Sequence, residues 1–315
     1  MRRFLATMLL PLSLVPVAFA VPYVAEQHES FSARYLDREA LASPDVGHVT
    51  APPVPAYRDR VPVLAYHGIN DGGGAYALTQ TAFAKQMAAL DEAGFHTISA
   101  HTYARFARGE QVRLPERPIL LTFDDGRVDS FRGADAVLEE HGFRATMFAI
   151  AGQTVDASRT YLGPDELASM EDSGRWDIQE HAGDGHVQIA SPDGKRRPYY
   201  ATLQPGETLG EFRTRVAGDL DEGARKLAAV VPDADFGDLF AVPYSDYGQT
   251  TGNPLVAGSS LRAMTARFTA VFVQHGDVQP TRRGQHGLLP RYEPKPGTTP
   301  QALLRVLRRG IDKEA

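Results

Sequence analysis

The sequence predicts an α/β fold in which short strands alternate with amphipathic helices. Apolar runs typical of buried strands recur along the chain, and stretches with apolar residues at helical spacing stand between them. Repeated strand–helix units imply parallel strands joined by helical crossovers, in a closed barrel or in a doubly wound sheet. No glycine-rich phosphate loop follows any of these strands, which disfavours a nucleotide-binding sheet.

The expected elements follow one another from residue 61. We expect strands over residues 61–66, 95–98, 118–123, 144–150, 176–180, 238–242 and 268–273. We expect helices over residues 83–93, 130–141, 164–173, 209–230 and 300–309. Gly142 and Gly174 stand where two of these helices should end, and residues from 181 to about 205 carry no regular pattern.

The N-terminal residues read as an export segment followed by a linker. Met1-Arg2-Arg3 precedes an apolar run of about 20 residues, long enough to cross a bilayer, and residues 18–20 (Ala-Phe-Ala) have the pattern that signal peptidase cleaves. Residues 1–25 are therefore expected to be a signal peptide or a signal anchor, which places the protein outside the cytoplasmic membrane, secreted or anchored. Residues 26–57 are polar and then proline-rich, so we expect an extracytoplasmic linker before a single catalytic domain at residues 58–315.

The composition excludes several kinds of chemistry. The chain has no cysteine, so any metal must bind to His, Asp or Glu, and a thiol nucleophile is excluded. The formal net charge of −6 is mild and the folded part has no block of like charges, which argues against nucleic acid as a partner. A neutral or cationic glycan is a more compatible partner.

Candidate metal-binding and catalytic residues lie where predicted strands end. An apolar strand runs into Asp124 and Asp125, and adjacent carboxylates repel each other unless a cation or a shared proton neutralises one of them. His181 follows another strand, and glycines in the loop after it allow His186 to curl back towards it. Two imidazoles and one carboxylate leave positions open for water and substrate, as a catalytic divalent metal requires. A solvated turn and surface histidines are the structural alternatives.

Four motifs occur in a fixed order. They are residues 63–68 (Val-Leu-Ala-Tyr-His-Gly), residues 122–126 (Thr-Phe-Asp-Asp-Gly), residues 144–148 (Arg-Ala-Thr-Met-Phe) and the pair His181 and His186. Together they resemble the NodB-homology polysaccharide deacetylases of carbohydrate esterase family 4, over roughly residues 61–291. The resemblance implies a distorted (β/α) barrel and a polysaccharide N-deacetylase that hydrolyses linear amide bonds and releases acetate.

The resemblance also implies roles for individual residues. Asp125, His181 and His186 would bind the metal, with Zn²⁺ as the first choice and Co²⁺ or Ni²⁺ as alternatives. Asp124 would take a proton from the attacking water. The backbone N–H of Tyr244 would hold the oxyanion in catalysis. Pro243, Tyr244, His67 and Arg291 are the expected substrate-binding residues.

Two details resemble one branch of the family. His181 and His186 are five residues apart where most members have four, and this spacing is similar to the branch that deacetylates poly-β-1,6-N-acetyl-D-glucosamine of biofilm matrices. Ala241, in the stretch Phe-Ala-Val-Pro-Tyr, stands where common members carry an arginine that orients the base. The orientation of Asp124 is therefore an open question. The implied partners are this exopolysaccharide, its synthesis machinery, and the membrane through the N-terminal segment.

The general acid that protonates the leaving amine is also open. Many family members use a late Leu-x-His motif, which is absent here. His275, after the strand at 268–273, is the expected catalytic residue, with His286 and Arg291 as further candidates. His67 ends a predicted strand and is expected at the edge of the substrate site, with a structural histidine as the alternative.

Three other functions stay open. A deacetylase of peptidoglycan or of a chitin-like glycan would use the same metal site. A catalytically silent polysaccharide-binding module would explain the missing late histidine motif. A metal-dependent glycosidase would need a second carboxylate across the scissile bond, for which Glu180 and Asp184 are nearby.

Overall fold

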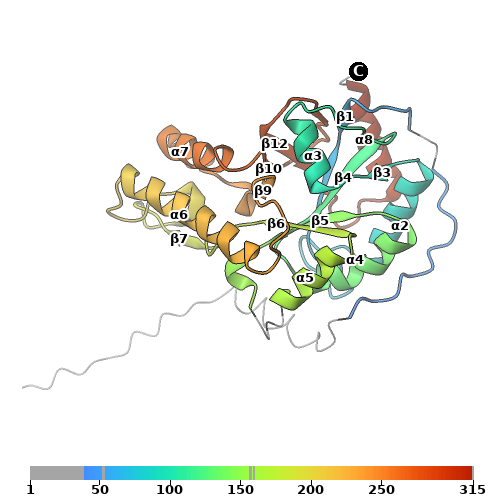
Figure 1. Ribbon diagram of the computed structural model, residues 1–315, viewed down its shortest axis with the longest axis horizontal. Coiled ribbons are helices and arrows are strands. Elements are labelled where there is room, and N and C mark those ends of the chain that lie inside the picture. The colour runs from blue at the N-terminus through green and yellow to red at the C-terminus, as the bar shows by residue number, and fades with distance from the viewer. Residues whose placement is uncertain (1–38, 52–53, 156–157, 159, 314–315) are drawn as a thin grey trace, which may run out of the picture.

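A closed barrel of parallel strands forms the centre of the protein (Figure 1). The computed structural model describes residues 39–51, 54–155, 158 and 160–313. The seven strands of the ring lie in the order β2 (Val63–Tyr66), β12 (Gly287–Tyr292), β10 (Ala270–His275), β9 (Leu239–Ala241), β6 (Trp176–Glu180), β5 (Ala145–Ala149) and β4 (Pro118–Phe123). β2 pairs with β4 and closes the ring, and β3 (His96–Thr97) extends the sheet from β4.

The barrel is distorted at two of its joints. β6 meets β9 through the single pair Glu180–Phe240, and β12 meets β2 through the single pair Tyr292–Leu64, whereas β5 and β6 pair along five residues. The predicted distorted (β/α) barrel is confirmed, and the doubly wound alternative is excluded by the β2–β4 pairing.

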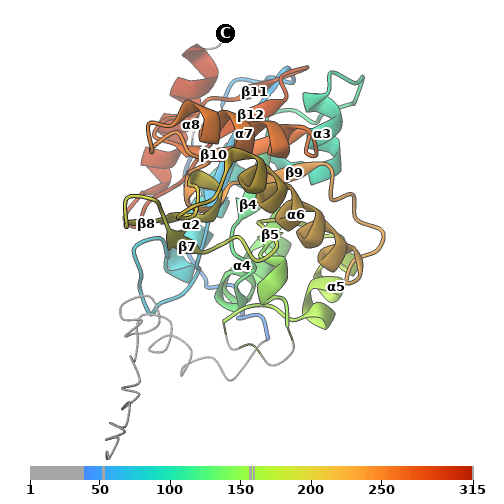
Figure 2. The same ribbon diagram turned by 90° about the vertical axis from the view of Figure 1, so that its left-hand side faces the viewer.

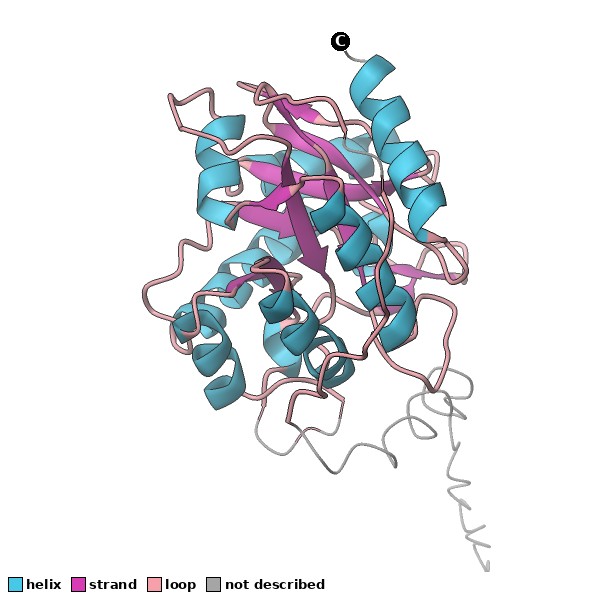
Figure 3. Ribbon diagram, turned by 90° about the vertical axis from the view of Figure 1, so that its right-hand side faces the viewer, coloured by secondary structure: helices cyan, strands magenta, loops and turns pink. Residues whose placement is uncertain are grey.

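Helices cover the outside of the barrel. Their bounds are α2 (Gln80–Glu92), α3 (Ala100–Ala107), α4 (Val128–Glu140), α5 (Pro164–Asp172), α6 (Leu209–Ala228), α7 (Pro254–Thr265) and α8 (Pro300–Lys313). Short 3₁₀ turns lie at η1 (Ala151–Gln153), η2 (Tyr199–Ala201) and η3 (Pro243–Ser245). α6, α7 and the hairpin of β7 (Gln188–Ala190) and β8 (Arg196–Pro198) share one side of the barrel, which Figure 2 shows face on. Figure 3 shows the opposite side, where α8 leads to the C-terminus.

Alternation along the strands separates an inner core from two outer ones. Leu120, Phe148, Ala241, Phe272 and Leu289 come from five different strands and form one buried cluster, which is the apolar filling of the barrel. α3 and β1 (Arg60–Val61) close the barrel at the amino-terminal ends of its strands, and β1 pairs with β11 (Thr281–Arg282). The outer faces of the strands pack against α2, α4, α5 and α8 in a second cluster and against α6 and α7 in a third. Polar side chains are thereby left to the carboxyl ends of the strands.

Most predicted elements are present, and the differences have physical causes. Helix α8 continues past Gly310 to Lys313, because that glycine packs against Val278 where an added Cβ would lie 2.5 Å from the carbonyl oxygen. β12 was not predicted, since Pro290 interrupts its pattern, and the short helix α3 and the helix α7 were also not predicted. The stretch expected to be irregular contains the β7–β8 hairpin.

Part of the expected linker belongs to the folded domain. Ala51 and Val54 are buried in the outer core, the N–H of Val54 donates to the carbonyl of Ala93 at 3.2 Å, and Leu41 donates to the carbonyl of Arg132 at 2.8 Å. The expected free spacer is therefore wrong for residues 39–51 and 54–57, because their apolar side chains find partners on α2 and α4. The export segment and the start of the linker lie outside the described residues. No helix of the described part is long and apolar enough to cross a membrane.

Candidate metal and catalytic site

Two carboxylates stand at the carboxyl end of β4. Alternation turns Leu120 and Thr122 into the barrel, so Asp124 also points inward and is fully buried. Asp125 follows with a φ of 76° and Gly126 with a φ of 70°, a left-handed turn that redirects the Asp125 carboxylate. The two neighbours in sequence therefore occupy different places, Asp124 in the mouth of the barrel and Asp125 beside the loop after β6.

Asp125, His181 and His186 form a group that can hold a metal ion. Asp125 Oδ1 lies 3.5 Å from His181 Nε2 and 3.3 Å from His186 Nε2, and the three ligand atoms lie within 4.8 Å of one another. Ligands about 2.0–2.1 Å from a tetrahedral ion are about 3.3–3.4 Å apart, so the spacing suits such an ion. The predicted convergence of these residues is thus found in the structure.

The protonation of the group also suits a cation. His181 Nδ1 lies 2.8 Å from the carbonyl oxygen of Ala241, which can only accept, so Nδ1 carries a proton and Nε2 is the ring nitrogen that faces Asp125. Burial lowers the pKa of His186 to about 4, which keeps it neutral. Burial alone would raise the pKa of Asp125, but His181 and His186 hold it below its ordinary value. Two imidazoles that face a carboxylate are a donor set for a divalent ion.

Arg291 orients Asp124. Its Nη1 donates to Asp124 Oδ1 at 2.7 Å and its Nη2 to Oδ2 at 2.6 Å, and Nη1 also donates to Thr122 Oγ1 at 2.9 Å. Both side chains are 0% exposed. Burial would raise the pKa of Asp124, but the guanidinium, followed by His181, holds it below its ordinary value. The prediction that Arg291 binds substrate or acts as an acid is wrong, because the guanidinium is buried and committed to Asp124.

His67 is the histidine that reaches Asp124. Its Nε2 lies 3.7 Å from Asp124 Oδ2, and its Nδ1 lies 3.1 Å from Oε1 of Glu293, a carboxylate that also accepts from Lys295. Burial would lower the pKa of His67, but Glu293, Asp124 and Asp125 together raise it. The side chain lies inside the site rather than at its edge. Glu293 was not predicted, although it follows Leu289 and Arg291 at the inward spacing of two.

His275 and His286 do not join this group. His275 is exposed, and its ring contacts Asp277 and Gln279. Its neighbour Gln274 faces the site instead, with Nε2 3.4 Å from Asp124 Oδ2, because β10 alternates. His286 precedes β12 and so lies at the opposite end of the barrel. The structure thus places the His275 ring outside the group around Asp124, and its catalytic role stays a prediction.

Two exposed tyrosines flank the polar residues. The Tyr244 ring lies 4.6 Å from that of His186 and is held by a hydrogen bond from its hydroxyl to the His186 carbonyl at 3.3 Å. The Tyr76 ring lies 5.5 Å from that of His67. Tyr244 is 46% and Tyr76 57% exposed, which is high for large aromatic side chains. Pro243 is buried whereas Tyr244 is exposed, so Tyr244, not Pro243, is available to a substrate.

Two carboxylates considered for a glycosidase are unsuited to that role. Glu180 is fully buried, and burial followed by Asp219 raises its pKa well above the ordinary value. Its carboxyl faces Gly223 of α6, where an added Cβ would lie 2.3 Å from Oε1. Asp184 is exposed and pairs with Lys226 at 3.0 Å.

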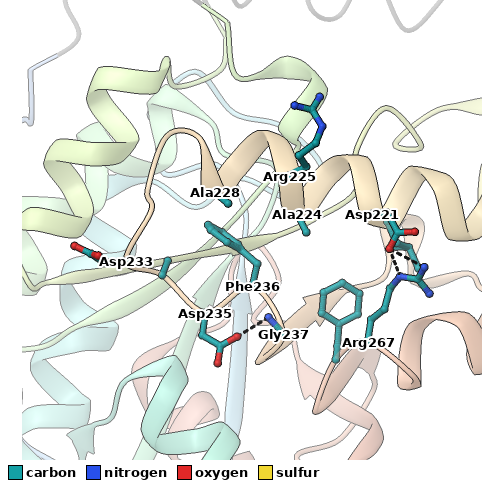
Figure 4. Close-up of a pocket in the computed structure, with 12 residues that line it drawn as sticks. Asp221, Ala224, Arg225, Ala228, Asp233, Asp235, Phe236, Gly237 and Arg267 are labelled. Carbon is teal, nitrogen blue, oxygen red and sulfur yellow. Dashed lines mark hydrogen bonds and ion pairs between the residues drawn. The ribbon is translucent and has the colours of Figure 1, made fainter.

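A separate hollow lies at the opposite end of the barrel. It has a volume of about 610 Å³ and lies between α6 and the segment that leads into β9 (Figure 4). Asp235 on its wall and nearby His101 and Asp238 form a second group of ligand-type residues. Arg108 already donates to Asp238 Oδ1 at 3.0 Å and His101 lies 3.1 Å from Oδ2, so both oxygens of Asp238 already have partners.

Residues 111–257 match the family model described as polysaccharide deacetylase. Asp124, Asp125, His181, His186 and Tyr244 lie within this match. The Bacillus subtilis protein YxkH, named for the same family, is 28% identical over 130 residues, 41% of this chain and 44% of that protein. The chain thus matches less than half the length of this curated relative.

Several solved structures share the fold. IcaB from Ammonifex degensii is 24% identical with a TM-score of 0.62, covering 80% of this chain and 98% of that one. A de-N-acetylase from Aggregatibacter actinomycetemcomitans is 17% identical with a TM-score of 0.62, covering 74% and 94%. The BpsB deacetylase domain from Bordetella bronchiseptica is 20% identical with a TM-score of 0.57, covering 76% and 100%. These likenesses establish the barrel.

Proposed function

We propose that the chain, which matches the polysaccharide deacetylase family model over residues 111–257, hydrolyses acetamide groups of an N-acetylglucosamine-containing exopolysaccharide and releases acetate. One observation carries the proposal: a ligand group of two histidines and one aspartate lies beside a buried aspartate that an arginine holds in place. Both lie at the carboxyl ends of barrel strands, where barrel enzymes place their chemistry.

Asp125, His181 and His186 would hold a divalent metal, with Zn²⁺ as the first choice and Co²⁺ or Ni²⁺ as alternatives. Such an ion polarises the acetyl carbonyl and lowers the pKa of water. His181 is fixed for this role by its bond to the carbonyl of Ala241. The exposed face of Tyr244 lies next to His186, so the acetamide can enter from that side, where the N–H of Tyr244 would hold the oxyanion.

Asp124 would take the proton from the attacking water. Its lowered pKa keeps it ionised at neutral pH, and the two bonds from Arg291 fix the direction of its remaining lone pairs. His67 would give a proton to the leaving amine. Its raised pKa favours the protonated form, Glu293 holds its Nδ1, and its Nε2 faces Asp124.

Poly-β-1,6-N-acetyl-D-glucosamine is the polymer we favour as substrate. The five-residue spacing of His181 and His186 and the alanine at position 241 both resemble the branch of the family that acts on it. Tyr76 and Tyr244 offer exposed aromatic faces on which sugar rings can stack. We also propose that the protein acts outside the cytoplasmic membrane, secreted or attached through residues 1–25, and meets the machinery that synthesises the polymer.

Acetate release from defined oligomers tests this function. The full chain would be assayed as purified, after chelation and after zinc re-addition, on β-1,6-linked N-acetylglucosamine oligomers, peptidoglycan fragments and chitin fragments. We expect release that needs both the metal and Asp124 and is largest on the β-1,6 oligomers, with Asp124→Asn as the inactive control. Release from another glycan alone would refute the substrate, and metal binding without release from any of them would refute the enzyme.

A further inference from the structure

The loop that carries the two histidines has a strained and crowded backbone. Ala182 has a φ of 111°, a conformation that residues with a side chain rarely adopt. An added Cβ on Gly183 would lie 2.5 Å from the carbonyl oxygen of Asp219, and one on Gly185 would lie 2.6 Å from Asp219 Oδ2. The loop is therefore pressed against α6 at Asp219. Such a path needs interactions that hold it.

Asp219 supplies those interactions from α6. Its Oδ1 accepts from the N–H of Asp184 at 2.8 Å, and its Oδ2 accepts from the N–H of Gly183 at 3.1 Å. The hydroxyl of Tyr200, which is fully buried, donates to the same Oδ2. One carboxylate thus binds two consecutive backbone N–H groups in the middle of the loop, and charge-assisted bonds of this kind are the stronger ones.

The other side of the loop is fixed by backbone alone. The carbonyls of Ala182 and Gly183 accept from the N–H groups of Ala151 at 2.9 Å and Gly152 at 2.8 Å in η1. The N–H groups of the loop face α6 and its carbonyls face η1. A substitution of Asp219 therefore removes the bonds to the N–H groups of Gly183 and Asp184 without changing the sequence of the loop.

We propose that Asp219 is a positioning residue that sets the separation of His181 and His186 and thereby the affinity of the site for its metal. This inference rests on the proposed metal site. His181 and His186 stand at the two ends of the loop, and their ring centroids are 4.9 Å apart. A loop that relaxes at Gly183 and Asp184 would move the imidazoles with respect to Asp125. Groups that hold metal ligands from behind typically change affinity about 10–100-fold when they are removed.

Asp221 offers a matched control on the same helix. Its side chain is 66% exposed and its carboxylate lies 2.7 Å from Arg267, a pair drawn in Figure 4. Asp221→Ala removes the same charge from α6 without touching the loop. Asp219→Asn keeps the shape of the side chain but leaves one oxygen to accept a hydrogen bond. Tyr200→Phe removes the bond from the Tyr200 hydroxyl to Asp219 and keeps the carboxylate. Both variants should therefore fold like the wild type.

Two measurements on the full chain test the inference. The first is the dissociation constant for zinc by competition with a chromophoric chelator, together with the visible spectrum of the Co²⁺ form. We expect affinity to fall about 10–100-fold in Asp219→Ala, less in Asp219→Asn, and not in Asp221→Ala, with a changed Co²⁺ spectrum in the first two. Equal affinities and spectra in the Asp219 and Asp221 variants would overturn the proposal.

The second measurement is hydrogen exchange of the peptide around residues 181–186 in the metal-free protein. We expect faster exchange in Asp219→Ala than in the wild type and in Asp221→Ala, and unchanged exchange would overturn the inference. If the wild type binds no metal, the proposed function fails, and the exchange data still decide whether Asp219 holds the loop. If metal affinity falls while acetate release from the saturated enzyme is retained, both proposals stand.

Discussion

Replacing Arg291 should uncouple Asp124 from its partner and shift the pH dependence of the reaction. Arg291 and Asp124 are both 0% exposed and share two hydrogen bonds, of 2.7 and 2.6 Å. Removing one partner of a buried ion pair costs about 3–5 kcal/mol, because the other charge stays buried and unpaired. Arg291→Gln should therefore lower the free energy of unfolding by about that amount at neutral pH.

The sign of the pH effect follows from the pKa of Asp124. In the wild type this pKa is lowered, so the pair stabilises the fold above the ordinary carboxyl range and the gain is lost as pH falls. Without the guanidinium, only His181 and His67 still oppose the effect of burial, so the pKa of Asp124 should rise. The folded variant then loses stability as pH rises, and the ionised base needed for turnover forms only at higher pH.

Urea unfolding and the pH profile of kcat/KM measure these effects. We expect the acid limb of the profile to move to higher pH in Arg291→Gln, with a loss of turnover of about 10²–10⁴-fold near neutrality. Arg291→Lys keeps the charge but cannot bind both carboxylate oxygens in the same way. Its turnover and the position of its acid limb should therefore lie between those of the wild type and of Arg291→Gln. An increase in KM alone, with the acid limb unmoved, would refute the orienting role and restore the substrate-binding one.

Three further outcomes are expected. Glu293→Gln should lower the pKa of His67, so the basic limb of kcat/KM should move to lower pH, since the protonated histidine is lost earlier as pH rises; an unmoved basic limb would count against His67 as the acid. Tyr76→Ala should raise KM for oligomers more than for a single sugar and leave kcat near the wild-type value. The same change in KM for both substrates would argue against stacking. Val54→Ala should lower the free energy of unfolding by about 2 kcal/mol in urea titrations, whereas a neutral effect would mean that this segment is not part of the domain.

Local sequence signals were sufficient to find the candidate metal ligands and the candidate base. Asp124, Asp125 and His181 each follow an apolar strand, and parallel strands that run the same way must bring their carboxyl ends together. Convergence of these residues is therefore a consequence of topology, which the strand–helix rhythm already predicts. The loop glycines that let His186 return are likewise visible in the sequence.

The predictions failed where a role depends on which side chains of a strand point into the barrel, or on contacts between residues far apart in the sequence. The strand before His275 was expected to end at residue 273, but β10 continues to His275, and the alternation puts Gln274 inward instead. Pro290 hid β12, and with it the inward spacing that joins Arg291 to Glu293. Asp219 lies 35 residues from the N–H that it binds, so no local pattern could reveal it.

The position of Arg291 explains how the alanine at position 241 is compatible with an oriented base. In a closed barrel, the inward side chains of several strands point at the same small volume, so a guanidinium can reach that volume from more than one strand. Ala241 on β9 pairs with Phe272 on β10, and the guanidinium of Arg291 on β12, the other neighbour of β10, lies 5.6 Å from the ring of Phe272. The charge that common family members are expected to place on the β9 side thus comes from the β12 side and meets the same carboxylate. A sequence motif shows which strand carries the arginine, whereas the chemistry depends on the position that its guanidinium reaches. In a barrel of this kind, the absence of one motif residue is therefore weak evidence against activity.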